Sequence, residues 1–183
     1  MSSNPTHPIQ IAGLKRELPL FEIKPGLKIA VLNILGDTEL VEACAKVLAK
    51  KLEAIEYDVI ITPEAKSIPI AYALSVATGK PYAVLRKNYK LYMGDATITK
   101  TLSITTGAPQ TLILDEKDSD LIKNKKVILI DDVISTGSTL KGMHQLMAKA
   151  KAKVVAETAI LTEGDQEEWE KVISLGHIPL FTK

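Results

Sequence analysis

The stretch that decides the fold is residues 127–139, which read VILIDDVISTGST. Four aliphatic residues run directly into two adjacent carboxylates, Asp131 and Asp132. A turn of small hydroxyl residues around Gly137 follows, and an amphipathic pattern begins at Thr139. A short apolar run bounded by a turn and a helix is typical of a buried strand in a parallel sheet. The segment therefore predicts a strand, a loop and a helix in that order.

The loop in this segment has the composition of an anion site. It offers consecutive backbone N–H groups without bulky side chains, and the following helix turns its positive dipole end toward the same point. Ligands of open parallel sheets bind beyond the carboxyl ends of the strands. A phosphate monoester fits the loop, whereas the two carboxylates suit sugar hydroxyls or a cation that bridges them. A phosphorylated ribose is the ligand that these residues imply.

Strands and helices alternate along most of the chain. Apolar residues at three- and four-residue spacing predict a helix over residues 40–55, capped by Asp37 or Thr38. The same reasoning predicts strands at 58–62, 81–86, 125–130 and 154–161, and helices from Ser67 to Gly79 and over 139–150. This order indicates an α/β fold with a mostly parallel, twisted sheet flanked by helices.

Two segments depart from this alternation. Residues 1–25 are rich in proline and have no clear period, so we expect an irregular arm or a small hood beside a domain formed by residues 26–183. Residues 89–110 are rich in Thr, Gly and Tyr. We interpret them as a long loop or mobile hairpin, and segments of this kind often act as lids.

Composition narrows the class of protein. The chain has 183 residues, 46% hydrophobic and 25% charged, as expected for one globular domain. Its 23 basic and 22 acidic residues leave no general positive field for nucleic acid or a membrane surface. Cys44 is the one cysteine, which favours a reducing, cytoplasmic location. One cysteine and three scattered histidines do not supply the closely spaced ligands of a zinc site. Walker and dinucleotide-binding glycine patterns are absent.

Residues 130–139, IDDVISTGST, resemble the phosphoribosyl pyrophosphate (PRPP) motif of the type I phosphoribosyltransferases. The resemblance covers roughly residues 25–165. Residues 62–68, TPEAKSI, look like the pyrophosphate loop of that family, and residues 85–90, LRKNYK, look like the basic stretch of its adenine, xanthine and archaeal hypoxanthine members. Residues 92–107 correspond to the flexible catalytic lid. The resemblance implies the type I phosphoribosyltransferase fold, with a small hood and a flexible lid loop.

The resemblance also implies the roles of individual residues. Asp131 and Asp132 would hold the ribose hydroxyls, the hydroxyl-rich loop the 5′-phosphate, and the basic residues the diphosphate. The expected PRPP ligands are Ala65, Lys66, Ser67, Arg86, Lys87, Lys90, Asp131, Asp132, Ser135, Thr136, Gly137, Ser138 and Thr139. Asp131, Asp132, Lys66 and Arg86 are the candidate catalytic residues. The chemistry agrees, because an oxocarbenium-like sugar and a highly charged leaving group call for cations and amides, with Mg²⁺ bound through PRPP rather than by a firm protein ligand.

The base is less clearly indicated. Ser135 argues against the eukaryotic hypoxanthine-guanine branch, where an Asp is usual. Adenine enzymes usually carry a Phe-Arg-Asp-like string where this chain has residues 29–32, and a lid Glu where it has Thr105. Leu32 and Asn33 resemble the start of the xanthine enzymes instead. The candidate base contacts are Asn33, Phe21 and Glu163. Chain length and residues 87–110 look most like the bacterial adenine enzymes, so adenine ranks first, with xanthine and hypoxanthine as alternatives.

Other classes stay open with less support. A PRPP-binding regulator without catalysis would keep the same motif, but such proteins usually carry a DNA-binding domain that residues 1–25 are too short to form. An orotate or other pyrimidine enzyme usually has more lysines in its lid than Lys100 alone. The expected activity is therefore purine salvage, and the resemblance implies a homodimer that binds PRPP and a purine base.

Overall fold

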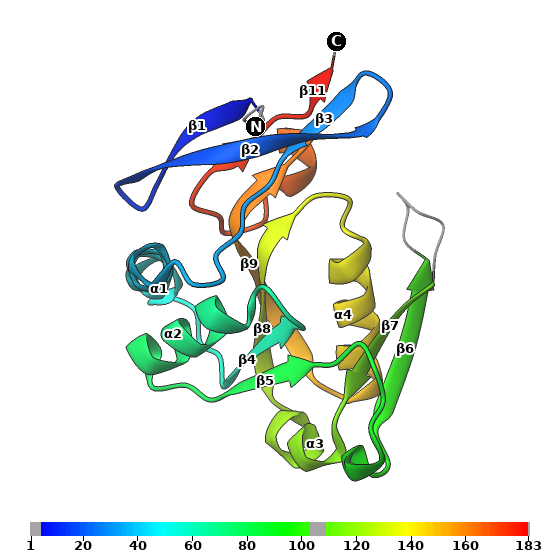
Figure 1. The fold of residues 1–183 in the computed structure, drawn as a ribbon. Helices are drawn as coiled ribbons and strands as arrows, with labels where there is room; N and C mark the ends of the chain where they lie inside the picture. Colours follow the sequence, from blue (N-terminus) through cyan, green and yellow to red (C-terminus); the bar gives the residue numbers. More distant parts are fainter. Residues whose placement is uncertain (1–4, 103–108, 183) are drawn as a thin grey trace.

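A five-stranded parallel sheet forms the centre of the computed structural model, which describes residues 5–102 and 109–182 (Figure 1). The strand order is β10-β9-β8-β4-β5, and each neighbouring pair is parallel. The strands are β4 (Val59–Pro63), β5 (Tyr82–Leu85), β8 (Lys126–Ile134), β9 (Lys153–Glu163) and β10 (His177–Ile178). The α/β class expected from the sequence is confirmed.

Helices cover both faces of this sheet (Figure 1). They are α1 (Thr38–Leu52), α2 (Ile68–Thr78), α3 (Glu116–Ile122) and α4 (Ser138–Lys149), with short 3₁₀ turns η1 (Leu91–Met93) and η2 (Gln166–Trp169). Ile128 packs in the cluster formed with α1 and α2, whereas Val127 and Leu129 pack with α4. Because successive strand side chains point to opposite faces, a stretch covered on both sides must be apolar at every position, as residues 127–130 of β8 are.

The N-terminal segment forms a second sheet. Strands β1 (Thr6–Ile11), β2 (Leu14–Lys24), β3 (Leu27–Ala30) and β11 (Phe181–Thr182) pair antiparallel in the order β1-β2-β3-β11. Of the two alternatives expected for residues 1–25, an irregular arm or a small hood, the irregular arm is wrong for residues 6–24, which form strands. The sheet also draws two strands from beyond residue 25. In Figure 1 it lies over the end of the parallel sheet where β8 and β9 finish.

Residues 89–110, expected to be a long loop or a mobile hairpin, contain a pair of antiparallel strands. Strands β6 (Thr97–Leu102) and β7 (Pro109–Leu114) pair antiparallel beside α4 (Figure 1). The Lys149 ammonium donates to the carbonyl of Ile98 at 2.7 Å, and the Arg86 backbone exchanges two hydrogen bonds of 2.8 Å with that of Ile113. Ile98 lies opposite Ile113, so both contacts tie the same end of the pair to the domain. Thr105 and the rest of residues 103–107 lie outside the described residues.

The strand that carries the acidic pair is longer than expected. The sequence predicts its end at residue 130, but β8 pairs with β9 as far as Ile134 opposite Thr162. Asp131 and Asp132 therefore lie on the strand, and β-sheet hydrogen bonding holds their backbone. Helix α1 ends at Leu52 rather than residue 55, and α3 and β3 were not expected.

Asp37 joins the N-terminal sheet to α1. Its carboxylate accepts a hydrogen bond from the backbone N–H of Leu40 at 3.1 Å and two from the Arg16 guanidinium at 2.7 and 2.9 Å. The hydrogen bonds from Arg16 are the main reason that the pKa of Asp37 is lowered, and the Leu40 amide adds to the effect. A lowered pKa means that folding favours the ionised carboxylate.

We predict that Asp37→Asn keeps the helix cap but loses the ion pair, whereas Asp37→Ala loses both and is about 1 kcal/mol less stable still. The advantage of the wild type over Asp37→Asn should be complete above the unfolded pKa of about 3.9 and disappear as the pH falls through the lower folded-state pKa. Urea unfolding from pH 7 downward measures this. An advantage that persists at low pH contradicts the assignment.

Candidate functional site

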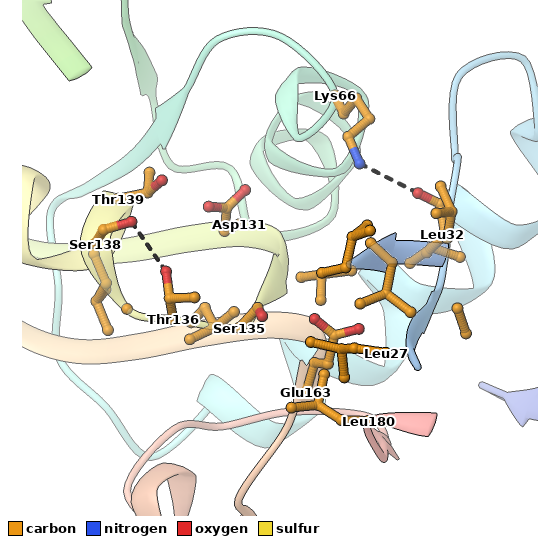
Figure 2. A pocket seen from close by; sticks show the side chains of 18 of the residues that line it. Leu27, Leu32, Lys66, Asp131, Ser135, Thr136, Ser138, Thr139, Glu163 and Leu180 are labelled. Atoms are coloured by element: carbon orange, nitrogen blue, oxygen red, sulfur yellow. Dashed lines mark hydrogen bonds between the residues drawn. The ribbon is translucent and has the colours of Figure 1, made fainter. Parts of the chain in front are cut away.

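A pocket of about 560 Å³ opens where the two sheets meet (Figure 2). One wall comes from the end of β8 and the start of α4, and another from β2, β3 and Leu180 near the C-terminus. Lys66 from the loop after β4 and Glu163 at the end of β9 complete it. The pocket thus lies at the carboxyl edge of the parallel sheet, where the sequence predicts it.

The predicted phosphate loop forms one wall of this pocket. All five of its residues line the cavity: Ser135, Thr136, Gly137, Ser138 and Thr139. Gly137 has a φ of 68°, and α4 begins at the next residue, so the first helical N–H groups lie at this wall. The hydroxyls of Thr136 and Ser138 are 3.1 Å apart (Figure 2). Free amides, hydroxyls and a helix N-terminus at one wall are the groups that bind a phosphate.

Trp169 supports this loop from behind. A Cβ atom added to Gly137 would lie 2.8 Å from Cη2 of the Trp169 ring. The indole N–H of Trp169 donates to the carbonyl of Glu163 at 3.0 Å, so the ring also holds the end of β9. The sequence analysis missed this residue. The signal available was that a lone tryptophan needs both apolar contact and a partner for its N–H.

The two carboxylates of the acidic pair have different surroundings. Asp131 lines the pocket, whereas Asp132 is buried and its Oδ2 lies 2.8 Å from the Lys66 ammonium. The backbone N–H of Asp132 donates to Oδ1 of Asp131 at 2.9 Å. Burial is the main cause of a raised pKa for Asp131, and the neighbouring Asp132 charge adds to it. Asp131 is therefore the carboxyl available to a ligand, and a cation or hydroxyl donor there would stabilise its ionised form.

The predicted pyrophosphate loop is built around its lysine. Lys66 Nζ contacts Asp132 and also donates to the carbonyl of Leu32 at 3.3 Å (Figure 2), while its side chain is 47% exposed. Ser67 is buried, and its hydroxyl donates to the carbonyl of Pro63 at 2.9 Å, which closes the loop before α2. Ala65 is exposed. Of the three predicted ligands in this loop, only Lys66 lines the main pocket.

Glu64 connects this loop to the basic segment after β5. Its carboxylate lies 2.8 Å from Nε of Arg86 and accepts the backbone N–H of Lys87 at 3.0 Å. The bond from Lys87 is the largest cause of a lowered pKa for Glu64, followed by the bond from Arg86, whose own pKa is raised by the pairing. The sequence analysis missed Glu64. An acid two residues before the loop lysine was the signal.

The basic residues themselves do not line the main pocket. Arg86 lines a smaller one near Asp115, and Lys87 and Lys90 are exposed.

The three residues predicted to contact the base do not line the same pocket. Glu163 lines the main pocket, whereas Phe21 and Asn33 line a neighbouring pocket of about 360 Å³. The Asn33 side chain accepts a hydrogen bond from the backbone of Leu35 at 3.2 Å, as a turn residue does. The apolar wall of the main pocket, which the sequence analysis missed, comes from the N-terminal sheet and the C-terminus and consists of Ile23, Leu27, Ile29 and Leu180.

We predict that Gly137→Ala disturbs the phosphate loop far more than its positive φ alone would. The left-handed backbone costs an alanine about 1–2 kcal/mol, and the added methyl must also displace Trp169. Gly79→Ala is the matched control, because Gly79 has a φ of 67° and nothing within 4 Å of an added Cβ. Tryptophan emission and ribose 5-phosphate binding should change in the first variant only. Equal effects in both variants would show that the contact is unimportant.

The site defines a class of protein. The pocket combines a hydroxyl-rich loop at a helix N-terminus, a carboxyl at the adjacent strand end and an apolar wall opposite them. Such a pocket suits a phosphorylated sugar that carries a flat, less polar group. The comparisons with known proteins agree. Residues 31–175 match the family model described as the phosphoribosyl transferase domain, and the chain belongs to that family. The resemblance inferred from residues 130–139 and the type I fold are confirmed, and the chain is a phosphoribosyltransferase.

Relatives and solved structures point the same way. An adenine phosphoribosyltransferase of Thermosipho africanus is 32% identical over 165 residues, which are 87% of this chain and 94% of that protein. A hypoxanthine/guanine phosphoribosyltransferase of Methanococcus voltae is 33% identical over 64% of this chain and 59% of its own length. The crystal structure of adenine phosphoribosyltransferase from Thermoanaerobacter pseudethanolicus matches with a TM-score of 0.68 at 20% identity, over 94% of this chain and 95% of that one.

None of the helices in residues 5–102 and 109–182 is long and apolar enough to cross a bilayer.

Proposed function

We propose that this protein transfers the phosphoribosyl group of PRPP to N9 of a purine, with adenine as the physiological base, and releases pyrophosphate in purine salvage. The observation that carries the proposal is one pocket that combines the phosphate loop, the Asp131 carboxyl and an apolar wall wide enough for a flat base. The adenine enzyme of Thermosipho africanus, similar over 87% of this chain, supports adenine as the base.

The arrangement of these groups supports a mechanism of positioning and charge stabilisation. The amides and hydroxyls of residues 135–139 hold the 5′-phosphate, and Asp131 accepts hydrogen bonds from the ribose hydroxyls. The bond from C1 to the pyrophosphate oxygen breaks, and its electron pair leaves with pyrophosphate. N9 of the base forms the new bond to C1 and its proton is released, so the products are a nucleoside monophosphate, pyrophosphate and a proton.

Positive charge for the leaving group comes from two loops. Lys66 stands at the pocket, and Arg86, Lys87 and Lys90 follow β5, with Arg86 held in place by Glu64. Electrostatic stabilisation of the departing diphosphate is the main catalytic effect that these residues can supply. The N-terminal sheet, which forms the apolar wall, acts as the hood over the base.

Mg²⁺ fits this site as a partner of PRPP. Within the described residues, no group of three or more His, Cys, Asp or Glu side chains could hold a metal ion. Mg²⁺ usually binds one or two carboxylates together with substrate phosphates, and the pocket offers Asp131 for this. When bound with PRPP, the ion supplies charge neutralisation at the diphosphate.

We also propose a cytoplasmic homodimer. The exposed Tyr72 and Val76 lie beside a groove between α1 and α2, which supports contact with a second copy. The single cysteine, Cys44, is buried and supports a reducing compartment.

Pyrophosphate release tests the proposed reaction. PRPP and Mg²⁺ are offered with adenine, hypoxanthine, guanine, xanthine and orotate in separate reactions. We expect release with adenine at the highest kcat/KM. Release with hypoxanthine or xanthine alone would name a different base, and PRPP binding by calorimetry without release from any base would make the protein a PRPP-binding regulator.

We predict that Asp132→Asn lowers kcat at least about 100-fold, because Lys66 would lose the charge that it pairs with beside the ribose. Asp120→Asn is the control, since it makes the same change on an exposed side chain of α3. Circular dichroism checks that both variants fold. Unchanged turnover in folded Asp132→Asn contradicts a role of the Asp132–Lys66 pair in the reaction.

A further inference from the structure

Glu163 is a carboxylate in an otherwise apolar part of the main pocket. The residue is only 5% exposed, and it ends β9 directly beside the phosphate loop. In Figure 2 its carboxyl points into the pocket, with Ser135 on one side and Leu27 and Leu180 next to it. None of the ion pairs among the described residues includes Glu163. The Ser135 hydroxyl supplies one of the hydrogen bonds that this buried carboxylate can accept, so its remaining lone pairs are open to a ligand in the pocket.

The backbone that carries this carboxylate is held from three directions. The Trp169 indole donates to the carbonyl of Glu163 at 3.0 Å, and the Gly164 N–H donates to the carbonyl of Ile178 at 3.1 Å. His177 bridges the residues on both sides, because its Nε2 donates to the carbonyl of Gly164 at 3.1 Å and its Nδ1 lies 2.9 Å from the hydroxyl of Thr162. A group whose position is fixed in this way is suited to discriminate between ligands.

The position of Glu163 determines which part of a substrate it can meet. The 5′-phosphate occupies the loop of residues 135–139 and the ribose lies at Asp131, so the remaining apolar part of the pocket is left for the base. Burial raises the pKa of Glu163, and the hydrogen bond from Ser135 and the charge of His177 offset this rise only in part. An ionised carboxylate only accepts hydrogen bonds.

This property separates the purines. Adenine carries an amino group, a donor, at its position 6, where hypoxanthine and guanine carry an oxygen, an acceptor. An acceptor-only side chain facing that position binds the amine and repels the oxygen.

We propose that Glu163 is the specificity-determining residue of this enzyme and that it selects the 6-amino group of the base against a 6-oxygen. This inference rests on the proposed purine transfer for its biological meaning. The expected preference for one nucleotide over another depends only on the residues that line the pocket. Phe21 and Asn33, which line a separate pocket, have no part in it.

The test compares two product nucleotides that differ only at the six position, so it does not require turnover. Calorimetry measures the binding of AMP, IMP and ribose 5-phosphate to the full chain. We expect wild-type protein to prefer AMP over IMP by at least about tenfold, and Glu163→Gln to reduce that preference by about tenfold, because a glutamine amide can offer either a donor or an acceptor. Binding of ribose 5-phosphate should stay unchanged.

Glu168→Gln is the matched control, since Glu168 is exposed on η2 and the change in charge is the same. Tryptophan emission verifies that the loop around Trp169 stays intact in Glu163→Gln. An AMP-to-IMP ratio that Glu163→Gln leaves unchanged overturns the proposal. A preference of the wild-type protein for IMP also overturns it, because the carboxylate would then accept from the ring N1–H. Equal binding of AMP, IMP and ribose 5-phosphate overturns it as well.

The two proposals can fail separately. If the wild-type protein prefers AMP through Glu163 but releases no pyrophosphate with any base, the proposed transfer fails and the proposed selection by Glu163 stands. If pyrophosphate is released with adenine while Glu163→Gln leaves the nucleotide preference unchanged, the proposed transfer stands and the proposed role of Glu163 fails.

Discussion

The structure depends on the parallel pairing of β8 with β9, which continues as far as Ile134 opposite Thr162. That pairing brings the acidic pair, the phosphate loop and Glu163 to one edge of the sheet, although Glu163 is far from the others in sequence. Both strands are buried on two faces, so their aliphatic side chains stabilise the layers and the site together. The acidic pair follows the aliphatic residues 127–130 directly.

Much of this arrangement could be predicted from residues 127–139, because an apolar run, an acidic pair and a hydroxyl-rich turn each have a local physical meaning. The length of β8 could not, since its last residues are held by pairing with β9 rather than by their own preference. The N-terminal sheet was missed for a similar reason. Its prolines obscure the alternation of β1 and β2, and β11 contributes only two residues from the opposite end of the chain.

Ion pairs within the chain explain why some side chains predicted to bind the diphosphate contact carboxylates instead. Lys66 lies 2.8 Å from a carboxylate oxygen of Asp132, and Arg86 lies 2.8 Å from one of Glu64. Sequence patterns show which loops carry charge, but the choice of partner depends on how the loops approach one another. These pairs hold the loops in a defined shape while leaving net positive charge from Lys87 and Lys90 in solvent.

The two hydrogen bonds between the backbones of Arg86 and Ile113 have a mechanical consequence. Residue 86 follows β5 and residue 113 belongs to β7, so a short bridge fastens the base of the β6–β7 pair to the basic segment. The same Arg86 is fastened through Glu64 to the loop before α2. The β6–β7 pair, the basic segment and the loop before α2 are therefore linked to one another. If one of them moves, either the other two move with it or one of these hydrogen bonds breaks.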